Sequence, residues 1–292
     1  MVKFTNSLLC LTNFIHQMLA ENNKDLQSIA LQYAEKYQTN NPFPNIYIDN
    51  FFEPSFLEKV LLEFPNVENL ADKLAYTNPN EKKLATKGES KFGPNTKKLV
   101  HYLNSEPFLS FLQIMTGIKE TLIPDPYFEG GGFHEIKTGG FLKLHVDFHR
   151  HRKMNLDRRL NLLIYLNKDW EEDYGGHFEL WEKDMSKSVT KILPVFNRMA
   201  LFTTSGDSWH GHPDPLTCPD GMSRKSLALY YYTNGRPKDE LNKRDSKRIT
   251  TTFAARKGID NSKMKQYNSF VNTLNTILPG PAIDFIKSIR KK

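Results

Sequence analysis

The segment from residue 122 to residue 232 alternates short strand patterns with glycine turns and has no helical pattern. Within it, Leu160–Leu166 (LNLLIYL) is almost entirely apolar, which is typical of a strand buried on both faces. Five or more short strands without intervening helices favour a barrel or a jelly roll. We therefore predict a mainly β protein with flanking helices. The other predicted strands are Phe133–Lys137, which we expect to form a hairpin arm leading into Phe141–Asp147, then His177–Trp181, Met199–Thr204 and Lys225–Tyr232.

The regions on either side of this segment have mixed patterns. Residues 1–40 have apolar residues at helical spacing, and a second helical pattern covers Val100–Thr116. A short strand is predicted at Asn45–Phe52 and a helix at Pro54–Phe64. We expect three parts: an N-terminal helical and strand support (1–121), the β domain (122–237) and a charged, helical C-terminal tail (238–292).

Residues 71–96 are polar and rich in lysine, with few apolar residues. They predict a long surface loop. Long loops in compact domains are often functional, so this loop is either a lid over a site or a disordered excursion.

Composition sets the class of protein. The hydrophobic fraction of 39% and the charged fraction of 25% are those of a soluble globular protein, and no apolar run approaches the ~20 residues of a membrane span. The net charge of +7 comes without a nucleic-acid-binding signature. Two cysteines, Cys10 and Cys218, fit a reducing compartment, so we predict a cytoplasmic protein. The apolar piece near the N-terminus contains polar residues and favours an ordinary helix over a targeting signal.

The strongest chemical feature is the stretch Phe141–Asp147, FLKLHVD. Strand alternation places Leu142, Leu144 and Val146 on one face and Lys143, His145 and Asp147 on the other. The imidazole of His145 and the carboxylate of Asp147 therefore point the same way, about 7 Å apart along the strand. Such a pair suits a metal or a proton transfer.

Two later motifs extend this pair. The sequence WHGHP offers a third ligand in His210 or His212, and we prefer His210. Two histidines and one carboxylate form the facial triad of non-haem Fe(II) oxygenases, which leaves metal positions open. Arg224 and Ser226 then share a strand face, where a guanidinium and a hydroxyl suit a carboxylate ligand.

The ordered set HVD, RRLNLLIYLNKDW, GGHFELW, WHGHP and RKSLALYYY resembles the prolyl-hydroxylase-like branch of the Fe(II)/2-oxoglutarate-dependent dioxygenases. The resemblance covers roughly residues 122–237 and implies a double-stranded β-helix (jelly-roll) core. It also implies oxidative decarboxylation of 2-oxoglutarate to succinate and CO2, coupled to hydroxylation of an unactivated C–H bond. The cofactors and cosubstrates would be Fe(II), 2-oxoglutarate and dioxygen.

The resemblance assigns roles to six residues. His145, Asp147 and His210 would hold the iron. Arg224 and Ser226 would hold the far carboxylate of 2-oxoglutarate, and Tyr165 would hydrogen-bond to the same group. The substrate stays open between a prolyl or other amino-acid or peptide side chain and a small molecule.

Several polar residues near these motifs have plainer interpretations. His149 and His151 lie in the polar run FHRHRK and are predicted on a surface loop. Arg158 and Arg159 could contact a substrate, but a charge pair before a strand is usually solvated, so we predict a solvated pair. A non-redox barrel that binds a metal or a sugar is the alternative function. It would have no need of a carboxylate clamp built from Arg224, Ser226 and Tyr165.

Overall fold

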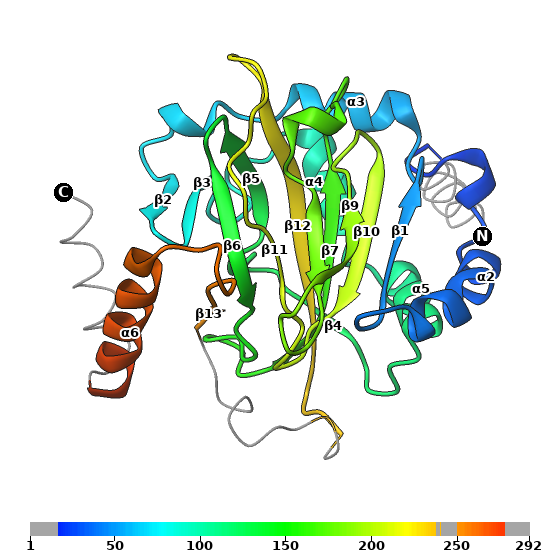
Figure 1. Cartoon of the computed structure of the whole chain (residues 1–292). Coiled ribbons are helices and arrows are strands. Elements are labelled where there is room, and N and C mark those ends of the chain that lie inside the picture. Colours follow the sequence, from blue (N-terminus) through cyan, green and yellow to red (C-terminus); the bar gives the residue numbers. More distant parts are fainter. Residues whose placement is uncertain (1–16, 238–239, 241–249, 278–292) are drawn as a thin grey trace, which may run out of the picture.

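The structure is a computed structural model, and it describes residues 17–237, 240 and 250–277. The described residues form one 13-stranded sheet with helices on its outside (Figure 1). The helices are α2 (Leu26–Thr39), α3 (Pro54–Leu62), α4 (Pro94–Leu103), α5 (Glu106–Thr116) and α6 (Ser262–Ile277), with 3-10 turns η1 (Glu21–Asn23), η2 (Val67–Asn69) and η3 (Glu172–Tyr174). The strands are β1 (Asn45–Asp49), β2 (Leu74–Asn78), β3 (Glu81–Ala85), β4 (Ile123–Pro124), β5 (Gly132–Lys137), β6 (Phe141–Val146), β7 (Asp157–Tyr165), β8 (Phe178–Trp181), β9 (Ser188–Ile192), β10 (Arg198–Thr203), β11 (His210–His212), β12 (Ser223–Thr233) and β13 (Thr252–Phe253).

Strand pairing produces a nearly closed barrel with two connected halves. The strands follow the order β1-β10-β7-β12-β5-β3-β6-β11-β8-β9, and each of the pairs is antiparallel. β3 joins the halves because Leu84 and Ala85 pair with β5 while Glu81 and Lys82 pair with β6. The predicted mainly β fold with flanking helices and a jelly-roll core is confirmed.

The two faces of the central strands have different neighbours. In β7, Leu160, Leu162 and Ile164 pack in the largest hydrophobic cluster, which also contains residues of α2, α3, α4 and α5. Asn161 and Tyr165 point to the opposite face, because side chains alternate along a strand. The helices therefore cover the outside of this half of the barrel, and the inside is left for the site (Figure 1).

Two predicted elements differ in detail. The helix expected at Val100–Thr116 is two helices, α4 and α5, since Ser105 has extended backbone and Pro107 follows it in the first turn of α5. The strand Phe133–Lys137 is present as β5, but it is not half of a hairpin with β6, because β3 lies between them.

The long loop expected at residues 71–96 was wrong for its central part. Residues 74–85 form the hairpin of β2 and β3, with Leu74 opposite Ala85. The hairpin is anchored by backbone pairing with β5 and β6. The sequence of this hairpin did not predict strands because it is rich in lysine, which is usually depleted in strands.

The C-terminal segment returns to the sheet. β13 pairs with β6, with Phe253 opposite His145, and α6 follows beside the β2–β3 hairpin (Figure 1). The rest of the predicted tail, and the N-terminal apolar piece up to residue 16, lie outside the described residues. The division at residues 121 and 237 stays a prediction. Among the described helices, none has the length and apolar character needed to cross a bilayer.

Candidate metal centre and carboxylate clamp

Two neighbouring strands bring the predicted metal ligands together. β6 and β11 are antiparallel, with His210 directly opposite His145, and Asp147 follows the last residue of β6. A Cβ on Gly211 would lie 2.7 Å from the carbonyl oxygen of Leu142, so glycine permits this close strand approach. One ligand atom from each of His145, Asp147 and His210 lies within 4.8 Å of the others.

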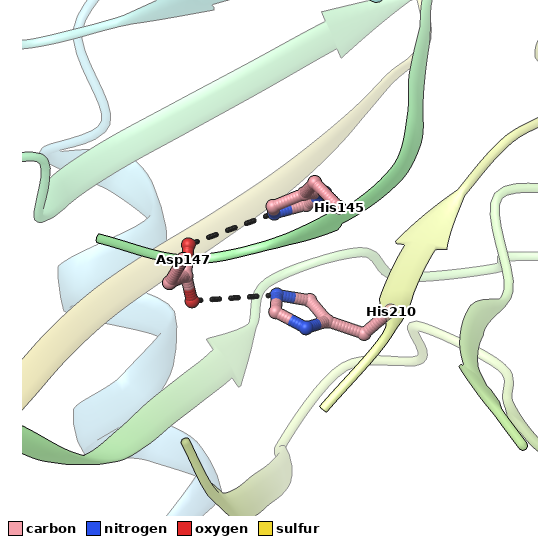
Figure 2. A group of neighbouring side chains, drawn as sticks. All are labelled: His145, Asp147 and His210. Atoms are coloured by element: carbon pink, nitrogen blue, oxygen red, sulfur yellow. Dashed lines mark ion pairs between the residues drawn. The ribbon is translucent and has the colours of Figure 1, made fainter. Parts of the chain in front are cut away.

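The side chains are oriented toward a common point (Figure 2). Nε2 of His145 is 3.6 Å from Oδ1 of Asp147, and Nε2 of His210 is 3.4 Å from Oδ2 of the same carboxylate. The Nδ1 atoms lie 2.9 Å from the Lys143 carbonyl oxygen and 2.8 Å from the Ser208 carbonyl oxygen. A carbonyl only accepts, so each Nδ1 carries the proton and each Nε2 presents a lone pair to the centre.

Asp147 is held by a buried polar network. Asn161 Nδ2 donates to Asp147 Oδ2 at 2.7 Å, and Arg158 Nη2 lies 3.2 Å from the same oxygen. Arg158 Nε in turn donates to Asn161 Oδ1 at 2.7 Å, and its guanidinium lies 3.4 Å from the centroid of the Tyr230 ring. The prediction that Arg158 and Arg159 are solvated was therefore wrong: both are buried, and Arg159 pairs with Glu120 at 2.8 Å.

The protonation states suit a divalent metal. Burial opposes ionisation of Asp147, but the Arg158 guanidinium and the two histidines hold the pKa of this carboxyl well below its usual range. Burial, with a further effect of His210, lowers the pKa of His145 to about 3. At neutral pH the cluster thus offers a carboxylate and an unprotonated His145 ring, which are the ligand forms that a metal binds.

The same burial makes the stability of the metal-free protein depend on pH. Burial, reinforced by Arg224, also lowers the pKa of His212 well below its usual range. Unfolded histidines titrate near 6.5, so below about pH 6.5 the unfolded chain binds protons that folded His145 and His212 do not. We expect the free energy of unfolding to decrease on acidification, by up to about 3 kcal/mol per pH unit from these two groups.

Urea unfolding of the metal-free protein between about pH 7 and 5 measures this slope. His212→Leu removes one of the groups and should reduce the slope, whereas the exposed His101→Asn should leave it unchanged. A free energy of unfolding that is constant or rises on acidification would contradict the prediction.

A second group of predicted residues lies on the inner face of β12 and β7. Ser226 is directly opposite Tyr165, and Arg224 lies two residues before Ser226 on the same face. Arg224 Nη2 donates to the Tyr165 hydroxyl at 3.4 Å, and its Nε donates to the Gly176 carbonyl oxygen at 2.8 Å. All three side chains are buried. Among the described residues no carboxylate pairs with Arg224, so this guanidinium has the environment of an anion-binding group.

The histidines after Asp147 are placed differently from the prediction. His149 and His151, expected on a surface loop, are only 5% and 1% exposed. Backbone amides of Lys153 and Met154 donate to His151 Nδ1 at 3.1 Å, and His151 Nε2 lies 3.2 Å from Asp125 Oδ1. The two histidines of this run are therefore buried, while Arg152 and Lys153 are exposed, and His151 anchors the turn that leads into β7.

Two residues of the site were not predicted from the sequence. Asn161 lies within an apolar run. A buried side-chain amide needs a hydrogen-bond partner, so an asparagine in such a run indicates a nearby polar group, which here is Asp147. Phe253 packs with its ring centroid 5.3 Å from that of His145, and it is more than one hundred residues further along the chain. No local pattern around Phe253 indicates this contact.

Comparison with known proteins agrees with this site. Residues 131–232 match the 2OG-Fe(II) oxygenase superfamily. A segment of 79 residues is 29% identical to mouse prolyl 3-hydroxylase OGFOD1, covering 26% of this chain and 14% of the mouse protein. The matched part is therefore a small fraction of that relative.

Two solved structures have the same fold. A Pseudomonas putida prolyl-4-hydroxylase aligns with a TM-score of 0.53 and 13% identity over 70% of this chain and 100% of that chain. A Trichoplax adhaerens prolyl hydroxylase, solved with a hypoxia inducible factor peptide fragment, aligns with a TM-score of 0.54 and 20% identity over 72% of this chain and 91% of that chain.

Residues 131–232 therefore form a segment of the 2OG-Fe(II) oxygenase type, and the His-Asp-His cluster in this part of the chain is a ligand set that suits Fe(II). Within this part of the chain, the 79 matched residues are similar to a prolyl hydroxylase.

Proposed function

We propose that the chain hydroxylates an unactivated C–H bond of an amino-acid or peptide side chain, with a prolyl residue as the first candidate. Succinate and CO2 would be released from 2-oxoglutarate. The observation that carries the proposal is a buried, convergent His-Asp-His cluster in the same barrel as a buried arginine without a carboxylate partner among the described residues. The prolyl candidate is supported by the short match to the mouse prolyl 3-hydroxylase.

Each site residue has a proposed task. His145, Asp147 and His210 hold Fe(II), which supplies the activation of dioxygen. Arg224, Tyr165 and Ser226 hold the distal carboxylate of 2-oxoglutarate and so fix its orientation. All three side chains are buried, and the low local dielectric strengthens their charge-assisted hydrogen bonds.

The proposed cellular setting follows the cysteine content. The chain has two cysteines, and Cys218 is a buried free thiol. This supports a reducing compartment, and we keep the cytoplasm as the proposed location. We also propose that residues 122–237 carry the chemistry, with residues 1–121 as support and 238–292 as a tail.

Succinate release with a panel of prolyl peptides and free amino acids tests the activity. The Fe(II)-loaded protein should form succinate in proportion to product that carries one added oxygen atom, detected by mass spectrometry. A peptide with hydroxyproline in place of proline and the Asp147→Ala variant are the controls. If no member of the panel raises succinate above the substrate-free rate, the proposed substrate class is wrong.

Arg158 provides a test of the network behind the metal ligands. Arg158→Met keeps an unbranched buried side chain but removes the charge that holds Asp147 ionised. We expect metal affinity to fall about 10- to 100-fold, the usual effect of losing a residue that orients a ligand. Anaerobic metal titration measures this, with Lys168→Met as the control because its ion pair with Glu58 is exposed. Unchanged metal affinity would show that Arg158 does not support the site.

A further inference from the structure

Phe253 contacts the metal cluster from a part of the chain to which the proposed function gives no task. In the register, His145 of β6 has His210 opposite it on one side and Phe253 of β13 opposite it on the other. The amide of Ala254 donates to the Leu144 carbonyl oxygen at 3.0 Å. Directly opposed residues of antiparallel strands place their side chains on the same face of the sheet. Phe253 therefore lies on the face that carries the metal cluster.

The His145 ring is packed by rings from both neighbouring strands. Its centroid is 4.3 Å from that of His210, with the two planes at 56°, and 5.3 Å from that of Phe253, with the planes at 38°. The bond from Nδ1 to the Lys143 carbonyl oxygen, at 2.9 Å, holds one corner of the imidazole. A metal ligand must present its lone pair within about 10–20° of the productive direction. The Phe253 ring supplies a second restraint on that direction.

Ion pairs hold the segment that carries Phe253 in place. Arg256 is 5% exposed, and its Nη2 lies 2.6 Å from Oδ1 of Asp214, in the loop after β11. Its backbone amide donates to Asp260 Oδ2 at 2.7 Å. The Asp260 side chain is 2% exposed, and its Oδ1 accepts from Lys143 Nζ at 2.7 Å. Lys143 lies on β6, so this network ties the segment to the strand of His145.

The same segment is also joined to the β2–β3 hairpin. Asn80 Nδ2 donates to Asn268 Oδ1 on α6 at 2.8 Å, and the Asn80 carbonyl oxygen accepts from the Lys143 amide at 2.8 Å. Figure 1 shows α6 beside this hairpin. Residues 252–268 thus contact the metal-bearing strand and its neighbour, although the segment that matches the oxygenase superfamily ends at residue 232.

We propose that Phe253 is a positioning residue of the metal site, whose ring fixes the orientation of the His145 imidazole. The C-terminal segment 252–268 thereby completes the site that β6 and β11 begin. The proposal rests on the proposed function in one respect, that His145 is a metal ligand. It gives a role to a contact between segments more than one hundred residues apart.

The first test measures Co(II) binding to the full-length protein by calorimetry, without 2-oxoglutarate. Phe253→Ala should bind Co(II) about tenfold more weakly, the lower end of the usual effect of losing a residue that orients a ligand. Phe253→Tyr keeps the ring and should bind nearly as the wild type does. Phe253→Leu keeps apolar packing without a ring and should fall between them. Phe270→Ala is the matched control, because Phe270 lies on α6 of the same segment and is exposed.

A spectroscopic signature separates positioning from a general structural role. In the Co(II)-loaded protein, the Nδ1 protons of His145 and His210 should give two strongly shifted proton NMR signals. Phe253→Ala should move one signal and leave the other near its wild-type position, because Phe253 packs on one of the two rings. If Phe253→Ala does not fold, Arg256→Met provides the same test. It removes the ion pairs that anchor the segment and should move the same signal.

The outcomes are distinguishable. Wild-type protein that binds no Co(II) would overturn the proposed function and the positioning role with it. Wild-type binding with equal affinity and unchanged signals in Phe253→Ala would leave that function standing and overturn the role of Phe253. Equal displacement of both signals, or a loss in Phe253→Tyr or Phe270→Ala as large as in Phe253→Ala, would also overturn it.

Discussion

Asp147→Ala should abolish metal binding and 2-oxoglutarate turnover, and it should also make the protein less stable. The carboxylate supplies the oxygen ligand of the cluster and lies within 3.6 Å of both histidine Nε2 atoms. It is also the counter-ion of buried Arg158. Removing one partner of a buried pair costs about 3–5 kcal/mol, so the expected loss of stability is of that size.

Anaerobic Fe(II) titration and urea unfolding measure the two effects. Asp49→Ala is the matched control, because Asp49 also pairs with an arginine, Arg198, but is exposed. It should retain metal binding and lose about 1 kcal/mol or less. His210→Ala should abolish metal binding as Asp147→Ala does, whereas His212→Ala should keep it. Wild-type turnover by Asp147→Ala, or the reverse order for the two histidines, would overturn the assignment of the ligands.

Arg224→Ala should weaken 2-oxoglutarate binding by about 30-fold to several thousand-fold, from a loss of about 2–5 kcal/mol. The guanidinium is buried and its protein partners are the Tyr165 hydroxyl and the Gly176 carbonyl, both neutral. Metal affinity should be unchanged. The metal-free variant should not lose the stability expected from breaking a buried ion pair, because among the described residues Arg224 forms none.

Two further variants show how much each residue contributes to 2-oxoglutarate binding. Tyr165→Phe removes one neutral hydrogen bond and should cost about 0.5–1.5 kcal/mol in 2-oxoglutarate binding. Lys168→Ala, whose ion pair with Glu58 is exposed, should bind 2-oxoglutarate as the wild type does. Binding that survives Arg224→Ala unchanged would mean that another residue holds the distal carboxylate.

The parts of the fold that could be predicted from the sequence have local patterns. Strand alternation in Phe141–Asp147 placed His145 and Asp147 on one face, and the apolar run at Leu160–Leu166 indicated a strand covered on both sides. These patterns depend only on residues two positions apart in the sequence, so they can be recognised without knowledge of the fold. His210 needed the family resemblance, since WHGHP alone does not say which histidine faces the cluster.

The parts that escaped prediction depend on contacts between distant segments. Arg158 was predicted to be solvated because its partner, Asp147, lies at the end of a different strand, β6. The arginine side chain becomes buried only when these strands come together in the barrel. The β2–β3 hairpin owes its place to backbone pairing with β5 and β6 rather than to apolar periodicity. Phe253 reaches His145 through a strand pair that links the C-terminal segment to β6.

The proposed function requires that one buried site binds Fe(II) and 2-oxoglutarate together. Anaerobic titration of the Fe(II)-loaded full-length protein with 2-oxoglutarate tests it most directly, followed by the visible metal-to-ligand charge-transfer band. We predict a saturable band with one equivalent of 2-oxoglutarate, lost in Asp147→Ala and shifted to much higher 2-oxoglutarate concentration in Arg224→Ala. Fe(II)-loaded wild-type protein that develops no band and shows no 2-oxoglutarate binding by calorimetry would contradict the account and favour a metal-binding barrel without redox chemistry.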